Sequence, residues 1–382
     1  MNPPSAGHRR KAQPNPADRQ DSASGHQVGD RATLARRMRT QARACRSLGS
    51  DLYSAMMERA ADELESGDVL MSVLHHHAQD PGDSALALRL FGATHRLALC
   101  GLAPRLAAHY PSTGGDGSLE GAWQAFLETV RTHADLVERA LTNPPQTNEV
   151  GRSAALLAGY FEIASRTSRP LRILEVGASA GLNLRFDQFR YQFGDVEWGN
   201  PASGVIFPPS WFVRKGMVLP RSPLAIAERS GCDMSPIDPT DPEGRLTLRS
   251  YLWPDQTERR LRLDAALDVA LTVPAPVEMA HAPDWLDRML GRRHEGVVTV
   301  VVHSIFIQYL RPQERSRMAR VIINAGARAD AQAPLAWLAL EPGGRQALVK
   351  LTLWPGIGTS RVVATAGFHG PPVDIAGISS PG

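Results

Sequence analysis

The sequence has few of the features that mark disulfide-stabilised, zinc-binding or membrane-spanning proteins. Its 382 residues include only three cysteines, Cys45, Cys100 and Cys232, which lie far apart and form no C-x-x-C pair. This pattern argues against a disulfide framework or a zinc site and favours a reducing compartment. No apolar run approaches the roughly 20 residues of a membrane helix, and the N-terminus lacks a hydrophobic signal segment. We therefore expect a cytoplasmic protein that crosses no membrane.

Strong charge of either sign is also missing. The formal net charge is +3, and Lys and Arg are interspersed with Asp and Glu. Without a basic stripe to neutralise a phosphate backbone, we expect no nucleic-acid partner and instead a small-molecule substrate. The consecutive histidines His75, His76 and His77 point in different directions on a helix, where metal sites use i, i+3 or i+4 spacing, so we expect no metal site. The sequence does not indicate an oligomeric state.

The chain is long enough for two domains of roughly 100–200 residues each. Its first 30 residues almost lack large apolar groups, which predicts disorder. Helical periodicity follows; for example, Trp123, Phe126 and Val130 fall at i, i+3 and i+7. No strand is indicated before residue 170. The predicted organisation is a disordered tail (1–30), a helical domain (31–145), a second domain (146–375) and a short tail (376–382).

Strands and helices alternate after residue 170. An unbroken apolar run at Val297–His303 is typical of a strand that is covered on both faces. Alternating elements with an antiparallel pair at the end indicate an α/β fold with a doubly wound sheet. The predicted strands are 172–176, 190–193, 196–198, 224–227, 246–252, 277–280, 297–303, 334–340, 348–354 and 361–368, and the predicted helices are 153–163, 257–271, 284–290 and 313–326.

Two segments near the first strand are candidates for the walls of a site. Polar residues precede the helix at 153–163, where Thr147 or Asn148 is placed to cap it and Glu149 and Arg152 fall in its first turn. These residues either form a cap with a surface ion pair or line a cleft beside the first strand. The Pro-rich, aromatic insertion Pro201–Pro223 is either a lid or a surface loop.

The segment Arg172–Leu184 carries the strongest local signal, a strand followed by a turn of small residues and an apolar-periodic segment that predicts a helix. Small residues let a turn approach a ligand closely. The turn matches G-x-S-x-G of the α/β-hydrolases, with Ser179 as nucleophile and His369 later in the chain. No strand is predicted upstream, however, and that motif follows a middle strand. The dinucleotide fingerprint G-x-G-x-x-G has a different spacing.

A third interpretation is a resemblance to the class I S-adenosylmethionine-dependent methyltransferases over residues 170–370. Glu175–Gly181 resembles their first motif, with Ser179 in place of a glycine, and Gly231–Pro236 resembles the second, whose acid binds the ribose hydroxyls. Val298–Leu310 resembles the motif of the fourth strand, and the closing strand pair resembles their terminal hairpin. The resemblance implies a Rossmann-like domain after the helical domain, and S-adenosylmethionine as cofactor. The cofactor-binding residues that it implies are Glu175, Gly177, Ser179, Gly181, Asn183 and Asp233, and a general base, where the acceptor needs one, would be His303, Glu149 or Asp187.

From about residue 34 the whole chain also resembles the bacterial DUF2332 family, which has no assigned reaction. The matching segments are 146–153, 175–183, 198–203, 231–242, 251–255, 303–310, 351–355 and 367–370. Methyl transfer needs little covalent help from the protein, because positioning the two reactants can supply roughly 7–11 kcal/mol of the barrier. We therefore expect an S-adenosylmethionine-dependent methyltransferase acting on an unidentified small molecule. The alternatives are a non-catalytic cofactor-binding or regulatory protein of the same fold, and a serine hydrolase that uses Ser179.

Overall fold

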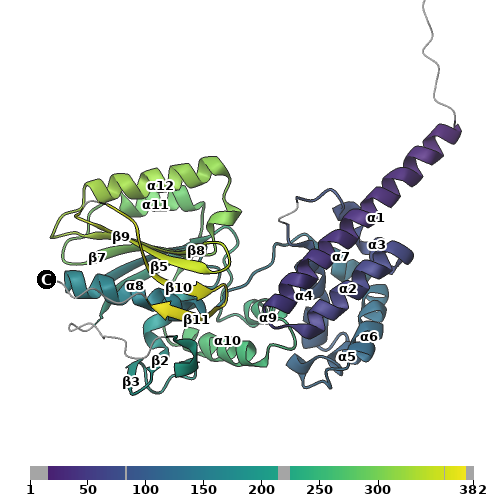
Figure 1. Ribbon diagram of the computed structural model, residues 1–382, viewed down its shortest axis with the longest axis horizontal. Coiled ribbons are helices and arrows are strands. Elements are labelled where there is room, and N and C mark those ends of the chain that lie inside the picture. The colour runs from purple at the N-terminus through teal and green to yellow at the C-terminus, as the bar shows by residue number, and fades with distance from the viewer. Residues whose placement is uncertain (1–15, 82–83, 214–223, 357, 376–382) are drawn as a thin grey trace, which may run out of the picture. The chain divides into compact units, whose positions relative to one another are not determined.

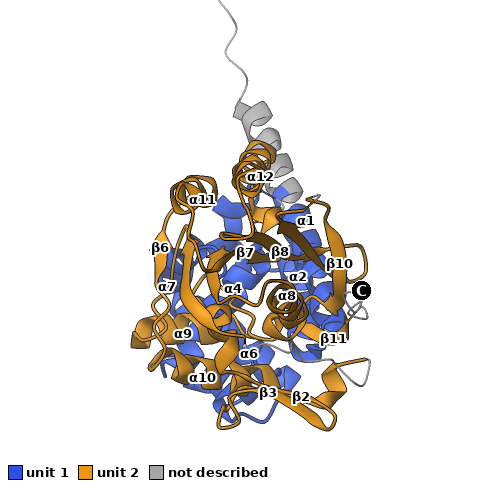
Figure 2. Ribbon diagram, turned by 90° about the vertical axis from the view of Figure 1, so that its left-hand side faces the viewer, with its two compact units in different colours: residues 1–145, 253–256 blue, residues 146–252, 257–382 orange. Residues whose placement is uncertain are grey.

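The protein divides into two compact units, which Figure 2 colours separately. Unit 1 comprises residues 1–145 and 253–256, and unit 2 comprises residues 146–252 and 257–382. The computed structural model describes residues 16–81, 84–213, 224–356 and 358–375, with side chains from residue 30 onward. The segment 253–256, which the sequence analysis assigned to the second domain, therefore belongs to the first unit.

Unit 1 is helical throughout its described residues, in agreement with the sequence analysis. In its core Tyr53 meets Phe91 edge-on with ring centroids 5.0 Å apart, and Phe91 stacks on Phe126 at 4.7 Å. Trp253 is buried in the same core and ties the returning segment to this unit. The elements are α1 (Pro16–Ser47), α2 (Asp51–Ser66), α3 (Val69–Leu74), η1 (His75–His77), α4 (Leu86–Leu99), α5 (Pro104–Ala107), η2 (Pro111–Thr113), α6 (Leu119–Thr132) and α7 (Ala134–Leu141).

Helix α1 begins at Pro16, inside the segment 1–30 that was predicted to be disordered. Among its residues with described side chains, from residue 30 onward, the first buried ones are Leu34 and Ala35. Once a helix has formed, each further residue adds a hydrogen bond at little additional cost, so the polar residues before Leu34 extend a helix that packing has already fixed. Residues 1–15 and the predicted tail 376–382 lie outside the described residues. None of the helices in the described part is long and apolar enough to cross a membrane.

Unit 2 is built around an eight-stranded sheet with the order β11-β10-β9-β8-β7-β1-β5-β6 (Figure 1). Strands β1, β5, β6, β7 and β8 are parallel, and in chain order they occupy the positions 3-2-1-4-5 across the sheet. Strands β8 to β11 continue as an antiparallel meander, and β2, β3 and β4 form a separate small sheet. The bounds are β1 (Leu171–Val176), β2 (Arg190–Phe193), β3 (Val196–Gly199), β4 (Ile206–Phe207), β5 (Ile226–Asp233), β6 (Val277–Met279), β7 (Val298–Ser304), β8 (Leu335–Pro342), β9 (Ala347–Trp354), β10 (Arg361–Gly367) and β11 (Gly370–Ile375).

Helices cover both faces of this sheet, with α8 on one face and α11 and α12 on the other (Figure 1). All six residues of β1 are buried, and neighbouring side chains enter different cores: Ile173 joins the core that includes α8, and Leu174 joins the one with α11 and α12. The same holds for β7, where Val300 joins the first core and Val301 the second, so the apolar run 297–303 lies in a strand that is covered on both faces, as predicted. The helical elements are α8 (Arg152–Thr167), η3 (Leu182–Gln188), η4 (Pro209–Trp211), α9 (Pro242–Ser250), α10 (Thr257–Ala270), α11 (Ala282–Leu290), η5 (Ile307–Tyr309) and α12 (Pro312–Ala327).

Two local predictions were wrong. The segment 246–252 was predicted to be a strand, but most of it belongs to helix α9 because Asp241 caps the helix by accepting a hydrogen bond from Gly244 N (3.0 Å) and Pro242 occupies its first turn. The segment after Gly181 was predicted to be an α-helix but forms the 3₁₀ stretch η3, which is irregular at Arg185. The chain after the first strand therefore offers no regular helix N-terminus to a ligand.

Candidate functional site

The carboxyl ends of β1, β5 and β7 meet at one edge of the sheet. Glu175, near the end of β1, lies opposite Gly231 of β5 on one side and Val302 of β7 on the other. The strand order reverses between β1 and β7, since the chain continues from β1 to β5 and β6 before it returns to β7. Open α/β sheets bind their ligands outside the carboxyl ends of the strands at such a switch point. We therefore examined residues 175–183, here called the β1 turn, and the residues around it.

Glu175 is buried, with 2% of its surface exposed, and its Oε2 atom has no hydrogen-bond partner among the described residues. Burial raises the pKa of this carboxyl to about 8, with the nearby charge of Asp233 adding to the effect and Arg152 and Arg185 opposing it. At neutral pH the group is therefore mostly protonated. A cation or a hydrogen-bond donor placed at Oε2 would favour its ionised form.

The backbone of the β1 turn is tightly packed. Gly177 has a φ of +69°, and a Cβ atom at this position would lie 2.2 Å from Cδ2 of Phe306. The phenyl ring thus occupies the space next to Gly177, which only glycine leaves open. Ile305, the residue before Phe306, has a φ of +50°. That conformation is strained for a β-branched residue, and such strain is concentrated at functional sites.

Asp233 connects the ends of β1 and β5. Its Oδ2 accepts a hydrogen bond from the backbone N–H of Ser179, and its Oδ1 accepts one from Ser235 N, both at 2.9 Å. The carboxylate is only partly buried, so solvent and ligand groups reach it in addition to these two donors. Asp233 therefore fixes the β1 turn while keeping an accessible edge.

The polar segment before α8 lies beside the β1 turn, and neither Thr147 nor Asn148 caps the helix, because its N-cap is Gly151. Three of its residues bond to the turn: Gln146 Oε1 accepts from Ser179 Oγ (3.0 Å), Asn148 Oδ1 from Leu182 N (2.8 Å), and Glu149 O from Asn183 Nδ2 (3.3 Å). Asn183 also accepts from Ser153 Oγ at 2.7 Å. This network makes Asn183 and Ser179 part of the scaffold of the turn.

A second group of charged residues lies at the start of α8. Glu149 is buried and accepts hydrogen bonds from Arg259 Nε (2.8 Å) and Gly151 N (3.0 Å). Burial alone would raise the pKa of Glu149, but Arg259, His369 and Arg152 outweigh it and hold the pKa at about 2. Burial, together with the charge of Arg259, lowers the pKa of His369 to about 4. We use the name α8 cluster for this group, which comprises Glu149, Arg152, Arg259, Arg262, His369 and Trp211.

The loop between β10 and β11 closes on this cluster. Arg152 donates to the carbonyl oxygens of Phe368 (3.1 Å) and Ser304 (3.2 Å). A Cβ on Gly151 would lie 2.2 Å from the carbonyl oxygen of His369, so only glycine permits this backbone contact. The two sequence segments 146–153 and 367–370, which lie far apart in the chain, are thus packed together.

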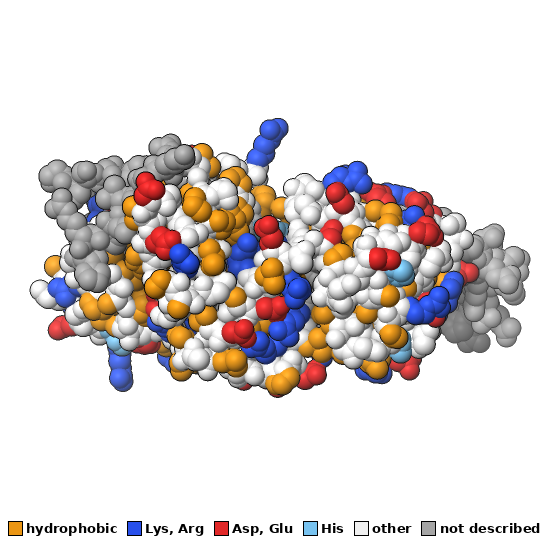
Figure 3. All heavy atoms as spheres, turned by 90° about the horizontal axis from the view of Figure 1, so that it is seen from below, with side chains coloured by type: hydrophobic (Ala, Val, Ile, Leu, Met, Phe, Trp, Pro, Cys, Tyr) orange, Lys and Arg blue, Asp and Glu red, His pale blue; other side chains and the backbone are white. Residues whose placement is uncertain are grey.

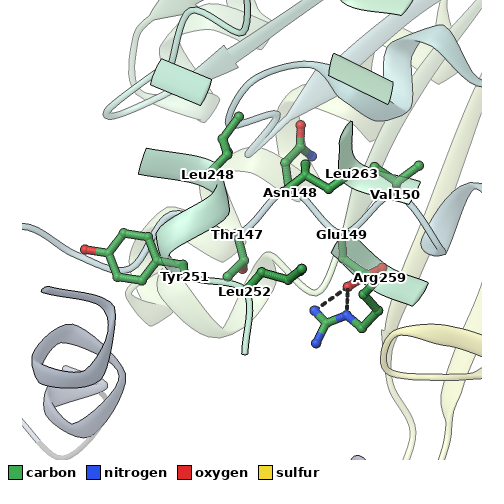
Figure 4. A pocket seen from close by; sticks show the side chains of 9 residues that line it. All are labelled: Thr147, Asn148, Glu149, Val150, Leu248, Tyr251, Leu252, Arg259 and Leu263. Atoms are coloured by element: carbon green, nitrogen blue, oxygen red, sulfur yellow. Dashed lines mark hydrogen bonds and ion pairs between the residues drawn. The ribbon is translucent and has the colours of Figure 1, made fainter. Parts of the chain in front are cut away.

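Figure 4 shows a small hollow against the Glu149–Arg259 pair. Its empty volume is about 320 Å³, open solvent at the mouth included. Four aliphatic side chains and Tyr251 form its apolar part, Thr147 and Asn148 add polar groups, and the ion pair provides its charged part. The lining residues are Thr147, Asn148, Glu149, Val150, Leu248, Tyr251, Leu252, Arg259 and Leu263.

The three residues considered as a general base are all engaged. His303 is buried; its Nδ1 is 2.7 Å from Glu341 Oε1, and its Nε2 is 2.9 Å from the indole N–H of Trp337. Because that indole can only donate, Nε2 accepts, and Nδ1 carries the proton that it donates to Glu341. Asp187 makes a bidentate ion pair with Arg229, at 2.6 and 3.1 Å. With Glu149 held ionised by Arg259, none of the three is poised to take a proton.

Sequence reasoning missed the role of Glu341. Its Oε1 accepts from the backbone N–H groups of Phe306 (2.9 Å) and Ile307 (3.3 Å) in addition to His303. The chain from Trp337 through His303 to Glu341 therefore positions the loop that carries Phe306. An acid at the end of the predicted strand 334–340 was the only signal, and its partner could not be read from the sequence.

The hydrolase alternative gains little from the geometry. Ser179 is buried, and its hydroxyl donates to the amide oxygen of Gln146, which cannot accept a proton as a general base. In the described part of the chain, β1 is also the first strand of its sheet. Of the insertion 201–223, the structure describes residues up to 213, including β4 and η4, and residues 214–223 lie outside the described residues.

No group of three or more His, Cys, Asp or Glu side chains suited to a metal ion occurs among the described residues. Charges of both signs are interspersed on the face that Figure 3 shows. Comparison with known proteins identified no matching curated protein and no matching solved structure. A family model described as "Uncharacterized protein conserved in bacteria (DUF2332)" matches residues 35–375. This match spans both structural units and every residue of the β1 turn and the α8 cluster, and the chain therefore belongs to the DUF2332 family.

Proposed function

We propose that the protein binds S-adenosylmethionine at the β1 turn and transfers its methyl group to a small molecule. The observation that carries this proposal is the position of Glu175 and Asp233. They stand at the carboxyl ends of two adjacent parallel strands, on either side of a glycine-containing turn at the switch point of the sheet. The strand order 3-2-1-4-5 supports a Rossmann-like assignment for these strands, with an antiparallel meander in place of further parallel strands.

The residues of the β1 turn fit such a cofactor chemically. Glu175 has a buried oxygen without a partner, which suits the positively charged amino-acid end of the molecule. Asp233 has an accessible carboxylate edge for the two ribose hydroxyls. Gly177 leaves the space that the ring of Phe306 fills, so Phe306 is the side chain that has to move. Its loop is strained at Ile305 and is held by Glu341 through the backbone N–H groups of Phe306 and Ile307.

The cofactor supplies a methyl group on a positively charged sulfur. The protein's own contribution in this proposal is positioning: Glu175 and Asp233 hold the two ends of the cofactor, and Arg152 fixes the loops after β7 and β10. Since His303, Glu149 and Asp187 are engaged, we propose an acceptor that reacts without a protein base. Orientation of the two reactants accounts for most of the rate.

Binding experiments test the two ends of the site separately. Titrating the full chain with S-adenosylhomocysteine, adenosine and methionine, by calorimetry and thermal shift, should show stabilisation of about 2.7 kcal/mol at 100 times the dissociation constant. Asp233→Asn should weaken adenosine and S-adenosylhomocysteine alike, whereas Glu175→Gln should weaken methionine and S-adenosylhomocysteine but not adenosine. Asp195→Asn, at an exposed position, is the control.

Three outcomes would contradict the proposal: no binding of any of these molecules, equal effects of all three variants, or unchanged affinity in Asp233→Asn. Binding without transfer of labelled methyl groups to any small molecule of a cell extract would instead support the non-catalytic alternative. The melting temperature of each variant without ligand separates loss of binding from loss of folding.

A further inference from the structure

Two arginines of the α8 cluster, Arg152 and Arg262, form no ion pair with any residue that the structure describes. Within the described residues, Arg152 donates only to the carbonyl oxygens given above, and no carboxylate oxygen lies within 4 Å of it or of Arg262. Burial lowers the pKa of both guanidinium groups. Buried charges in proteins are usually paired, because removing an ion from water without a partner is costly.

The guanidinium group of Arg262 is held by an aromatic ring, and none of the described residues accepts a hydrogen bond from it. Its guanidinium carbon lies 4.3 Å from the ring centroid of Trp211. Its Nε is buried without a hydrogen-bond partner, and in the described part of the chain the group donates no hydrogen bond. Stacking occupies a face of the guanidinium, while its N–H donors point outward in the plane of the group. Trp211 thus holds the plane in place and leaves its donor edge for an acceptor.

The surroundings of Arg262 are positively charged. Arg259 lies one helical turn away on α10 and is already paired with Glu149. The nearby charges that act on Arg262 are Glu149, Arg259 and the exposed Glu258. Trp211 also approaches the start of α8, since its Cη2 would lie 3.3 Å from a Cβ on Gly151. The buried carboxylate of Glu149 is therefore close to three arginines, Arg152, Arg259 and Arg262.

We propose that Arg262, stacked on Trp211 beside the Glu149–Arg259 pair, anchors a site for the oxyanion of a small acidic ligand, a carboxylate or a phosphate monoester. Guanidinium groups bind both oxyanions through paired N–H donors. The hollow of Figure 4 lies against the Glu149–Arg259 pair and is lined by Arg259 and Leu263 of the same helix α10. That this ligand is the methyl acceptor rests on the proposed function, whereas the anion site itself does not.

The test uses four probes that share one ring. Benzoate and phenyl phosphate carry the two candidate anions, benzylamine carries the opposite charge, and benzyl alcohol carries none. Calorimetric titration of the full chain at low salt, without S-adenosylmethionine or its product, should show binding of at least one anion and of neither control. The preferred anion identifies the source of the oxyanion, and its affinity should fall as salt is added.

Variants decide whether Arg262 is the anchor. Arg262→Gln should weaken the preferred anion at least tenfold, and Arg262→Lys should weaken it several-fold because the charge stays while the planar donor edge is lost. Arg320→Gln removes the same charge from an exposed position of α12 and should change nothing. S-adenosylhomocysteine affinity should stay unchanged in all three, so failure of the anion site and failure of the cofactor site are distinguishable. Absence of anion binding, or equal binding by Arg262→Gln and Arg320→Gln, would overturn the inference.

Discussion

The α8 cluster and the β1 turn each contain a buried glutamate, and the two glutamates behave in opposite ways. Glu149 has a pKa of about 2 because Arg259 and its neighbours outweigh the cost of burial, whereas Glu175 has a pKa of about 8 because no cation compensates that cost fully. Burial alone would raise both pKa values. The charged groups around each carboxylate, and not the extent of its burial, therefore decide which of the two is ionised at neutral pH.

This difference suggests a division of roles. A paired carboxylate with a low pKa keeps its charge at every physiological pH and holds a structure together. An unpartnered one exchanges a proton near neutral pH and responds to an arriving cation. Such perturbed groups are concentrated at functional sites. The α8 cluster is therefore the part of the site whose charge is fixed, and the β1 turn is the part whose charge responds to pH and to a ligand.

Breaking the ion pair of the α8 cluster should have the largest effect. Glu149→Gln removes the buried carboxylate charge that faces Arg259, Arg152 and Arg262, and we expect the free energy of unfolding to fall by about 3–5 kcal/mol. Urea denaturation of the full chain, followed by tryptophan fluorescence, measures it. Glu197→Gln breaks the exposed pair with Arg190 and should lower the stability far less, because solvent screens exposed ion pairs. Equal losses in the two variants would show that the buried pair is not what stabilises the cluster.

The next-largest effect is expected in the pH dependence of stability, to which Glu175 and Glu149 should contribute in opposite directions. Glu175 holds its proton more tightly in the folded chain, so its contribution is complete below pH 4.5 and is lost as the pH rises towards 8, at up to about 1.4 kcal/mol per pH unit. Glu149 and His369 have lowered pKa values, and their contributions are instead lost as the pH falls, below about 4.5 and 6.5 respectively. Subtracting the stability curve of Glu175→Gln from that of the parent isolates the first contribution. A flat difference between pH 5 and 8 would contradict it.

Most of the sheet could be predicted from the sequence, because its central strands are continuous apolar runs bounded by turn residues. The predicted strand 172–176 lies within β1, and 297–303 overlaps almost all of β7. The strand predicted at 246–252 was wrong because Asp241 and Pro242, which start helix α9, precede the segment and outweigh its β-like composition. Residues that cap and begin a helix therefore have to be considered before the strand propensity of the residues that follow them.

The candidate site could be predicted only in part. Glu175, Gly177 and Asp233 were found because their positions at strand ends are local properties of the sequence. Contacts such as Phe306 on Gly177 could not be found in this way, since they join residues far apart in the chain. The stacking of Arg262 on Trp211 is equally nonlocal, as helix α10 and the insertion 201–223 have no sequence signal in common.

The next-largest effect on stability is expected from a change in the packing of the β1 turn. Gly177→Ala places a methyl group against Phe306 and imposes a left-handed φ on alanine, which should cost about 1–3 kcal/mol. Gly194→Ala is a matched control, because its φ of +77° carries the same conformational penalty while nothing lies within 4 Å of the added atom. The difference between the two variants measures the ring contact. It should vanish in the Phe306→Ala background, and a persisting difference would mean that Phe306 does not fill this space.

The smallest effect is expected at Ser179, where the β1 turn and the segment before α8 meet. Ser179→Ala removes the hydrogen bond to Gln146 and retains the backbone conformation, since alanine and serine have the same penalty at a φ of +51°. We expect a loss of about 1 kcal/mol in unfolding free energy, and unchanged binding of S-adenosylhomocysteine, because the N–H that Asp233 accepts from is kept. Labelling by a fluorophosphonate probe distinguishes this scaffold role from that of a nucleophile. A parent protein that is labelled, with labelling abolished in Ser179→Ala, would mean that Ser179 is activated and that the β1 turn is a catalytic elbow instead of a cofactor site.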